Sequence, residues 1–418
     1  MKSKIFLLIV TSLFIFSSCN EDNGDYKIVN VATAKYMTKD ALRKSVIITA
    51  PAPIVESGKI YAYKNLVLVN DIDKGIHIID NSDPKNPFKI AFISIIANKD
   101  MEVKGDYLYA DSLMDLLVFD ISDLSNITEV TRLTDVFPSY IPIPFMEDLY
   151  IEYGNRNYNN NELIVGWDIT QERKSLAEIE EMNTGVFFED AVLMNMDASS
   201  GTTGQGGSLA RFKIVNDYLY AVDSHNINIF NIDNLEKPQQ LQSVFAGFDI
   251  ETIFNKEDHL FLGSMRGMYV YNIKDPASPQ LISEFEHGTA CDPVVVDDNY
   301  AYITLRAGNG CGALDSSLQI VDITDIANPE LKKSYEMDNP YGLGIISDLL
   351  FICDGTSGLK VYDKTDINNL KMVNHYKNIQ TYDVIPLEEH LLMIGDKILY
   401  QYKYQDEGIA LLSKFSLD

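Results

Sequence analysis

Apolar and polar positions along the chain repeat one pattern several times. Four or so apolar residues end in Asp or Asn, a short acidic turn follows, and a second apolar run completes the unit, as in "LQIVDITDIANPELKKSYEM" at 318–337. Similar stretches stand at 76–95, 116–133, 227–245, 268–285 and 359–376. Apolar runs separated by turn residues are typical of paired β-strands. The pattern therefore predicts a chain built from repeated strand–turn–strand units.

The spacing of the units predicts the architecture. The second acid of the unit recurs at Asp83, Asp123, Asp233, Asp275, Asp325, Asp366 and Asp406. Neighbouring intervals are 40 residues from 83 to 123, 42 from 233 to 275, 50 from 275 to 325, 41 from 325 to 366 and 40 from 366 to 406. A period near forty is typical of a four-stranded propeller blade. We interpret the repeated acid as structural, because Asp caps such turns through its own backbone.

A pair of strand-like runs joined by a tight polar turn precedes each repeated stretch. Eight such hairpins lie near 58–70, 101–111, 141–153, 212–223, 250–263, 293–305, 343–353 and 383–395. Each unit then holds four consecutive strands, named A to D here. We predict an all-β fold, an eight-bladed β-propeller of four-stranded antiparallel blades, with seven blades as the alternative because the ring closure is ambiguous.

Two stretches make the closure ambiguous. The third unit keeps "LIVGWDIT" at 163–170, but residues 171–182 have helical spacing in place of an outer strand. Residues 39–49 resemble an outer strand that could help to close the ring, whereas the last unit brings its own at 409–415. An insertion at 183–209, rich in Gly and Ser, joins the third unit to the fourth, and we expect it on the ligand face as a lid, a docking loop or a plain flexible insertion.

The N-terminal residues predict export. Lys2 and Lys4 precede the apolar run "IFLLIVTSLFIF" at 5–16, which is too short to span a bilayer. Ser17 and Ser18 stand directly before Cys19, which resembles a bacterial lipobox in which the cysteine is acylated. The acidic stretch "NEDNGDY" at 20–26 resembles an export tag to the cell surface, with a solvated tether as the alternative. We therefore expect a lipoprotein signal peptide at 1–18, a tether and closing strand at 19–50, and the propeller at 51–418.

The repeated stretches "LQIVD", "LLVFD" and "IHIID" resemble the LVIVD repeat of bacterial exported β-propellers. The resemblance covers roughly residues 55–418 and implies a propeller in an exported lipoprotein. From this and the N-terminal residues, we expect a lipoprotein anchored in the outer membrane, facing the periplasm or the cell surface. The resemblance implies no activity and no catalytic residues.

Charge narrows the choice of partner. The sequence has 34 Lys+Arg against 61 Asp+Glu, and removing residues 1–18 also removes two lysines, so the mature balance is 32 − 61 = −29. Such a surface repels phosphate backbones and anionic headgroups. We expect no nucleic acid partner, membrane contact only through the N-terminal lipid, and a monomer.

The D–A and B–C connections of a propeller surround the mouth of the central channel, where ligands usually bind. The sequence places the following candidates on that face: Asp100, Arg211, His225, His287, Asp292, Arg306, Asp354 and Asp383. Several carboxylates around one channel could hold Ca²⁺ through oxygen ligands, but Asp is also an ordinary hairpin residue. We expect no cofactor, with Ca²⁺ as the alternative.

The sequence shows no G-x-S-x-G, H-E-x-x-H, P-loop or C-x-x-C motif. Only His225 and His287 could share a site, so an enzyme, metal-assisted or not, is the alternative to a binding or scaffold module for a protein or glycan partner. Cys291 and Cys311 are expected on one face of one blade, and an exported protein favours a disulfide between them over two free thiols.

Overall fold

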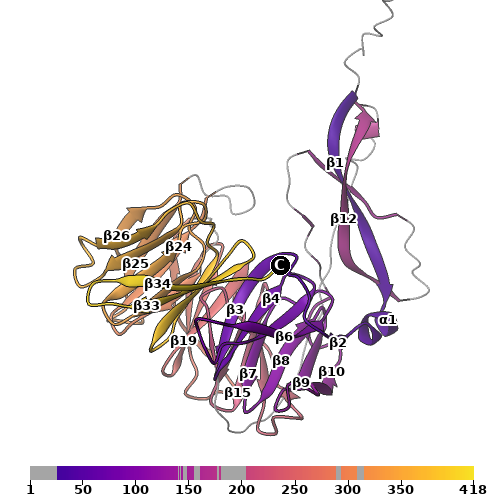
Figure 1. Ribbon diagram of the computed structural model, residues 1–418, viewed down its shortest axis with the longest axis horizontal. Helices are drawn as coiled ribbons and strands as arrows, with labels where there is room; N and C mark the ends of the chain where they lie inside the picture. Colours follow the sequence, from indigo (N-terminus) through magenta and orange to yellow (C-terminus); the bar gives the residue numbers. More distant parts are fainter. Residues whose placement is uncertain are drawn as a thin grey trace, which may run out of the picture. The chain divides into compact units, whose positions relative to one another are not determined.

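The computed structural model describes residues 26–139, 141, 143–144, 148–154, 161–176, 178–179, 204–288, 293–307 and 315–418. The chain divides into two compact units, of which the larger contains residues 36–143, 157–166 and 189–418. The described residues form eight β-sheets, the number of units that the hairpins predict. Figure 1 labels many of these strands.

Seven of these sheets are blades of consecutive antiparallel strands. The first blade contains β3 (Ser57–Tyr63), β4 (Leu66–Asp71), β5 (Gly75–Asp80) and β6 (Phe88–Ser94). The second contains β7 (Met101–Lys104), β8 (Tyr107–Ser112), β9 (Asp115–Asp120) and β10 (Thr128–Leu133). The third contains β14 (Phe212–Val215), β15 (Tyr218–Val222), β16 (Asn226–Asn231) and an outer strand split into β17 (Gln239–Gln240) and β18 (Val244–Phe245).

The remaining four blades follow in order. The fourth contains β19 (Ile250–Lys256), β20 (His259–Ser264), β21 (Gly267–Asn272) and β22 (Gln280–Glu286). The fifth contains β23 (Val294–Val296), β24 (Tyr300–Leu305), β25 (Ser317–Asp322) and β26 (Glu330–Glu336). The sixth contains β27 (Leu343–Ile346), β28 (Leu349–Cys353), β29 (Leu359–Asp363) and β30 (Lys371–Tyr376). The seventh contains β31 (Asp383–Pro386), β32 (His390–Gly395), β33 (Ile398–Tyr404) and β34 (Ile409–Ser416).

The first strands of the seven blades follow one another around a closed ring. Strand β3 neighbours β7, then come β14, β19, β23, β27 and β31, and β31 neighbours β3 again. The all-β propeller prediction is confirmed. Of the eight predicted units, seven form this ring, which closes as the seven-blade alternative describes.

The third predicted unit forms the eighth sheet instead, in the order β11-β1-β12. It contains β1 (Tyr26–Thr38), β11 (Leu149–Glu152) and β12 (Glu162–Ser175), and β1 pairs in parallel with β11. The helix expected from residue 171 is wrong for 171–175, because pairing with β1 holds these residues in β12. Sheet pairing has overridden local propensity here.

The turn chemistry read from the repeats is confirmed. In the first blade Oδ1 of Asp80 accepts the Ser82 amide at 2.8 Å, and Oδ1 of Asp83 accepts the Lys85 amide at 3.0 Å. In the third blade the second cap is Asn234, whose Oδ1 accepts from Glu236, and not the predicted Asp233. Asn caps this turn as well as Asp does. In this blade the capping residue therefore stands one position after the acid that the repeat pattern indicates.

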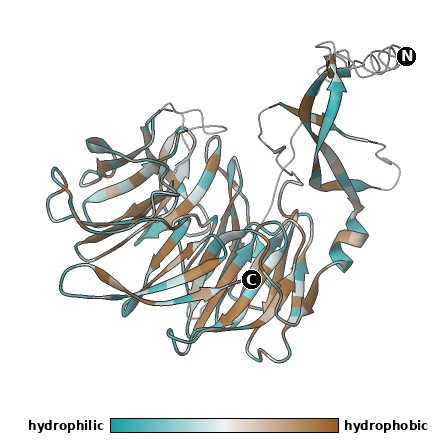
Figure 2. Cartoon of the chain, turned by 45° about the horizontal axis from the view of Figure 1, so that its top comes forward, coloured by the Kyte–Doolittle hydropathy of each residue, from teal (hydrophilic) through white to brown (hydrophobic). Residues whose placement is uncertain are grey.

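Apolar side chains of neighbouring blades form the core between them. Figure 2 shows brown, apolar residues along the strands and teal, hydrophilic residues in the connecting turns. In six of the seven blades the outer strand carries a β-bulge against strand C. A bulge twists an edge strand and hinders pairing with another chain.

The first and last blades close the ring through direct contacts. Ile60 and Val67 pack in one cluster with Ile385 and Leu392. The buried side-chain amides of Asn81 and Gln401 exchange two hydrogen bonds, of 2.6 and 3.2 Å. Each of these two blades supplies all four of its own strands.

The N-terminal stretch at 39–49 is largely a helix and not the expected strand. Helix α1 (Lys39–Lys44) begins after Thr38, whose hydroxyl oxygen accepts the Ala41 amide as an N-cap. Only β2 (Ile47–Thr49) is extended, and it adds a further strand outside β6.

Candidate functional site

A segment of the chain itself lies inside the ring. Strand β13 (Gln205–Gly206) pairs antiparallel with the free inner edge of β3. The Gly204 amide donates to the Tyr61 hydroxyl at 2.8 Å, and the Gln205 side chain donates to the Pro386 carbonyl at 3.1 Å. Farther along, the hydroxyl oxygen of Ser208 accepts the Leu343 amide at 2.8 Å. Residues 204–210, the channel segment, thus contact the first, sixth and seventh blades from the middle of the ring.

Glycine is what lets the channel segment enter. A Cβ on Gly204 would lie 2.4 Å from the Tyr61 ring, and a Cβ on Gly207 would lie 2.0 Å from Oδ2 of Asp383. Any side chain there would overlap the channel wall. The last residues of the predicted 183–209 insertion therefore lie within the channel, whereas residues 183–203 lie outside the described part of the chain.

A cavity of about 520 Å³ opens at one end of the channel. Its lining comes from D–A connections, from the starts of strands A and from B–C turns, which is the predicted ligand face. Leu209 of the channel segment also lines it. The charged and aromatic lining residues are Glu56, Lys59, Lys99, Arg211, Glu251, Arg306, Tyr341, Tyr382 and Asp396.

Both lysines of the lining form ion pairs with carboxylates that do not line the cavity. Lys59 Nζ lies 2.7 Å from Oδ2 of Asp100, and Lys99 Nζ lies 2.6 Å from Oδ1 of Asp73. Burial lowers the pKa of Lys59, and the neighbouring Asp100 opposes this shift. The predicted residue Asp100 is therefore an internal counterion, whose Oδ2 also accepts the amide of Phe212 at 2.8 Å.

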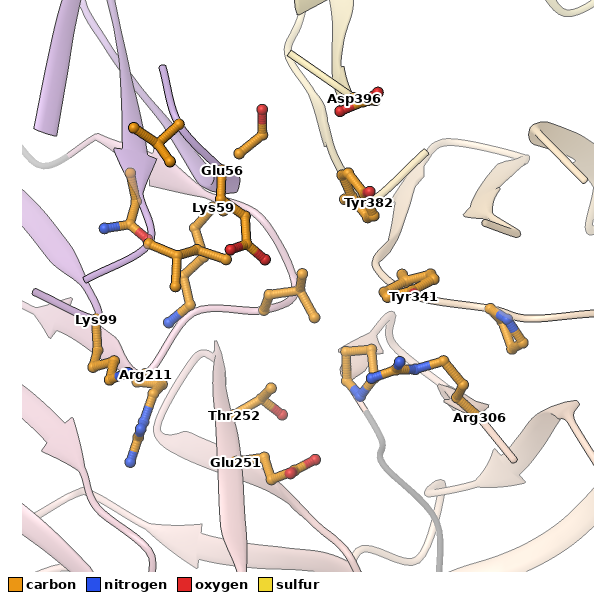
Figure 3. A pocket seen from close by; sticks show the side chains of 18 residues that line it. Glu56, Lys59, Lys99, Arg211, Glu251, Thr252, Arg306, Tyr341, Tyr382 and Asp396 are labelled. Atoms are coloured by element: carbon orange, nitrogen blue, oxygen red, sulfur yellow. The ribbon is translucent and has the colours of Figure 1, made fainter. Parts of the chain in front are cut away.

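The two lining arginines differ from these lysines. In the part of the chain that the structure describes, neither Arg211 nor Arg306 forms a side-chain ion pair or hydrogen bond. The guanidinium of Arg306 lies over the Tyr341 ring, 4.2 Å from its centroid. Tyr341 and Tyr382 meet edge to face with centroids 5.4 Å apart. In Figure 3, Lys59, Lys99 and Arg211 lie on one side of the cavity, and Tyr341, Tyr382 and Arg306 lie on the other.

Two aspartates of the B–C turns, Asp111 and Asp354, are structural. Oδ1 of Asp111 accepts the amides of Lys99 and Asp100 at 2.8 and 2.9 Å, and burial raises the pKa of this carboxyl to about 6. Asp354, a predicted ligand-face residue, accepts the amide of Asn339 and pairs with Lys360. These carboxylates face backbone amides of the D–A connection of their own blade and do not converge on the channel as a group.

Asp383 is the exception among the buried acids. It is fully buried; Oδ1 accepts the Val384 amide at 3.0 Å, whereas Oδ2 has no hydrogen-bond partner among the described residues. Burial raises the pKa of this carboxyl to about 7. Asp383 lies behind the channel segment and does not line the cavity.

The remaining predicted residues do not meet at one place. His225 is exposed and lies beside Phe248, with ring centroids 5.6 Å apart, whereas His287 is buried beside Phe285. Neither histidine lines the cavity, so of the seven predicted residues that the structure describes only Arg211 and Arg306 do. Asp292, Cys291, Cys311 and Cys19 lie outside the described residues.

No group of three His, Cys, Asp or Glu side chains within the described ranges could hold a metal ion. Among the helices of that same part of the chain, none is long and apolar enough to cross a membrane.

The sequence reading missed Lys59, Lys99 and the two tyrosines. Tyr341 and Tyr382 each stand just before a strand A, in "NPYGLG" and "IQTYDV". The repetition of a tyrosine just before strand A could have pointed to these residues, but attention to acids and histidines alone passes over it.

Two regions of the chain match a known repeat family. An LVIVD repeat profile matches residues 97–135 and 287–337. The chain therefore carries LVIVD repeats in these two regions, as the repeated stretches predict. No curated protein sequence matches the chain.

Similar solved structures share little sequence with this chain. They include the computationally designed Ika8 protein, with 10% identity, a TM-score of 0.49, and coverage of 88% of this chain and 89% of that one. BamB from Moraxella catarrhalis has 6% identity, a TM-score of 0.48, and coverage of 91% and 98%. Hsv2 from Kluyveromyces lactis has 10% identity, a TM-score of 0.48, and coverage of 87% and 100%.

Proposed function

We propose that this protein is an exported lipoprotein whose propeller binds a protein or glycan partner at the mouth of its channel. The observation that carries the binding function is the cavity of about 520 Å³, which falls in the range of ligand sites, about 300–1,000 Å³. Its walls come from several blades, and the channel segment contributes Leu209. A cavity whose walls are strands and turns of the folded ring is pre-organised, which lowers the entropic cost of binding.

The N-terminal sequence supports the anchor. An apolar run at 5–16 followed by Ser17, Ser18 and Cys19 has the order of a lipoprotein signal, and the acidic stretch after Cys19 suits a solvated tether toward the cell surface. The acidic mature chain disfavours direct adsorption to anionic headgroups, so the lipid would be its membrane contact.

The anchor is tested by expressing the full chain and its Cys19→Ala variant in a Gram-negative host supplied with a labelled fatty acid. We expect label and membrane fractionation for the wild type and neither for the variant. Protease treatment of intact cells then separates a surface-facing protein from a periplasmic one. Equal labelling of both chains, or a soluble wild type, would contradict the anchor.

The binding function is tested with residues 20–418, screened against a glycan array and a panel of purified envelope proteins. For a ligand so found, the Tyr341→Ala/Tyr382→Ala double variant should bind at least about tenfold more weakly, because it removes an aromatic wall. The matched control is Tyr107→Ala, which lies at an A–B turn on the opposite face. A ligand that binds the double variant as tightly as the wild type would place binding elsewhere.

A further inference from the structure

We propose that the cavity is specific for an acidic saccharide, a short oligosaccharide whose carboxylates are bound by Arg211 and Arg306. This inference rests on the proposed binding function and names the ligand class of the same site.

The first observation is the state of the two arginines. An arginine near the surface of a protein with 61 acidic residues and 34 basic ones has many carboxylates available as partners. Both lining arginines nevertheless form no ion pair with any residue in the described ranges, whereas both lining lysines do. A guanidinium presents a planar fork of donors that matches a carboxylate. Arg211 acts on the Asp111 carboxyl only through its charge, which opposes the raised pKa of that group, and forms no ion pair or hydrogen bond with it. The two guanidinium groups therefore point to a ligand that brings its own carboxylates.

The placement of the arginines indicates more than one acidic group. Arg306 lies over the Tyr341 ring, a contact that leaves its N–H groups available as donors. Arg211 comes from the third blade and Arg306 from the fifth, and they line different sides of the cavity (Figure 3). A chain of uronic acid units carries a carboxylate on each ring, so two units could meet the two arginines.

The lining carboxylates suit a ligand with many hydrogen-bond donors. Glu56, Glu251 and Asp396 also face the cavity, and they would repel a ligand whose carboxylates are not accompanied by donors. Every sugar hydroxyl both donates and accepts a hydrogen bond. A saccharide can therefore donate its hydroxyl hydrogens to these acids and bind the arginines through its carboxylates. This would explain why the cavity lining contains both acidic and basic side chains.

The aromatic wall suits the same ligand. Tyr341 and Tyr382 are half-buried and meet edge to face, so they offer apolar ring surface next to polar groups. The C–H faces of a sugar ring are apolar and pack on such surfaces, while the ring's edges carry the hydroxyls. Amphipathic walls of this kind match a flat, hydroxylated ring.

The test uses the folded chain 20–418 and a set of oligouronates, namely galacturonate, mannuronate and guluronate trimers and a chondroitin tetrasaccharide. Each is paired with its carboxyl-reduced form, which keeps the ring and the linkages and removes the charge. Binding is measured by calorimetry. We expect at least one oligouronate to bind with a Kd below about 1 mM, and its carboxyl-reduced form to bind about 10- to 100-fold more weakly.

Variants then assign the residues. Arg211→Ala and Arg306→Ala should each weaken binding about 10- to 100-fold, and Arg211→Lys should restore only part of it, because lysine lacks the planar fork. Only the backbone amide of Arg211 bonds to Asp100, so truncating its side chain leaves that contact in place. Arg266→Ala is the matched control, since Arg266 lies in an exposed B–C turn outside the cavity lining.

Each result decides the inference. It is overturned if no oligouronate binds below about 1 mM, if the carboxyl-reduced forms bind equally well, or if the Arg211→Ala and Arg306→Ala variants bind like Arg266→Ala. If a neutral glycan or a protein binds at the cavity in a way that depends on Tyr341 and Tyr382, the proposed function stands and the acidic saccharide does not. If neither kind of ligand depends on the cavity, both are wrong.

Discussion

Replacing Asp383 by Asn should stabilise the protein at neutral pH, although it removes a buried charge from the channel wall. Oδ2 of this carboxylate has no hydrogen-bond partner among the described residues, and burial raises the pKa of the group from 3.8 to about 7. The folded state therefore binds this proton more tightly than the unfolded state does. The contribution of Asp383 to stability is fully present below pH 3.8, is lost as the pH rises toward 7, and is constant above that.

The magnitude follows from the difference in pKa. A shift of about three units at 1.36 kcal/mol each corresponds to at most about 4 kcal/mol between pH 4 and pH 8. The asparagine side chain is neutral at every pH and nearly the same size, so it keeps the acceptor for the Val384 amide without this loss. The free energy of unfolding of Asp383→Asn minus that of the wild type should therefore increase between pH 4 and pH 7.

Urea denaturation at pH 4, 5, 6, 7 and 8 measures this difference, and the pH dependence of other groups such as Asp111 cancels in it. Asp100→Asn is the matched control, and it should lower the free energy of unfolding. The Asp100 carboxylate is paired with Lys59 and accepts the Phe212 amide, so its neutralisation leaves a half-buried lysine without its counterion. A variant Asp383→Asn that is less stable than the wild type at pH 8, or a difference that does not change with pH, would refute the reasoning.

Three further predictions concern the same contacts. Gly207→Ala should cost about 1–3 kcal/mol of unfolding free energy, because the new Cβ overlaps Asp383, and a double-mutant cycle with Asp383→Ala should show most of that cost relieved. Gln401→Leu should cost about 1–3 kcal/mol in urea denaturation, because it leaves the buried amide of Asn81 without partners where the ring closes; the double variant with Asn81→Leu should recover part of this loss, and an unchanged double variant would contradict it. Asp354→Ala should lower the melting temperature, because it leaves Lys360 without its counterion and the Asn339 amide without its acceptor. The ligand affinity of the folded protein should stay unchanged, and a specific loss of affinity would show that Asp354 takes part in binding.

Local contacts explain why the repeats could be read correctly. The caps at Asp80 and Asp83 bind amides only two residues away, so their chemistry is contained within a few residues of sequence. The alternation of apolar residues within each strand likewise reflects which side faces a neighbouring blade. The propeller and its LVIVD repeats follow from these local patterns.

Long-range contacts decided the features that the repeats left open. The third unit has strand-like runs, but its strands pair with β1, more than a hundred residues away, and the ring closes with β7 beside β14. The roles of Asp100 and Asp354 were also ambiguous, because an acid beside a channel and an acid bound to amides have the same sequence context.

The sequence by itself determined the blade, its turns, its period and the face on which ligands could bind, because each depends on residues within one repeat of about forty. Only the tertiary structure decided what lies inside the ring. The channel segment enters because Gly204 and Gly207 fit against Tyr61 and Asp383, residues far apart in the chain. The cavity is likewise lined by side chains from several blades, and the charge of its lining depends on which lysines form ion pairs with carboxylates outside the lining. Such pairings exist only once the ring has closed, because they join residues that no local pattern connects.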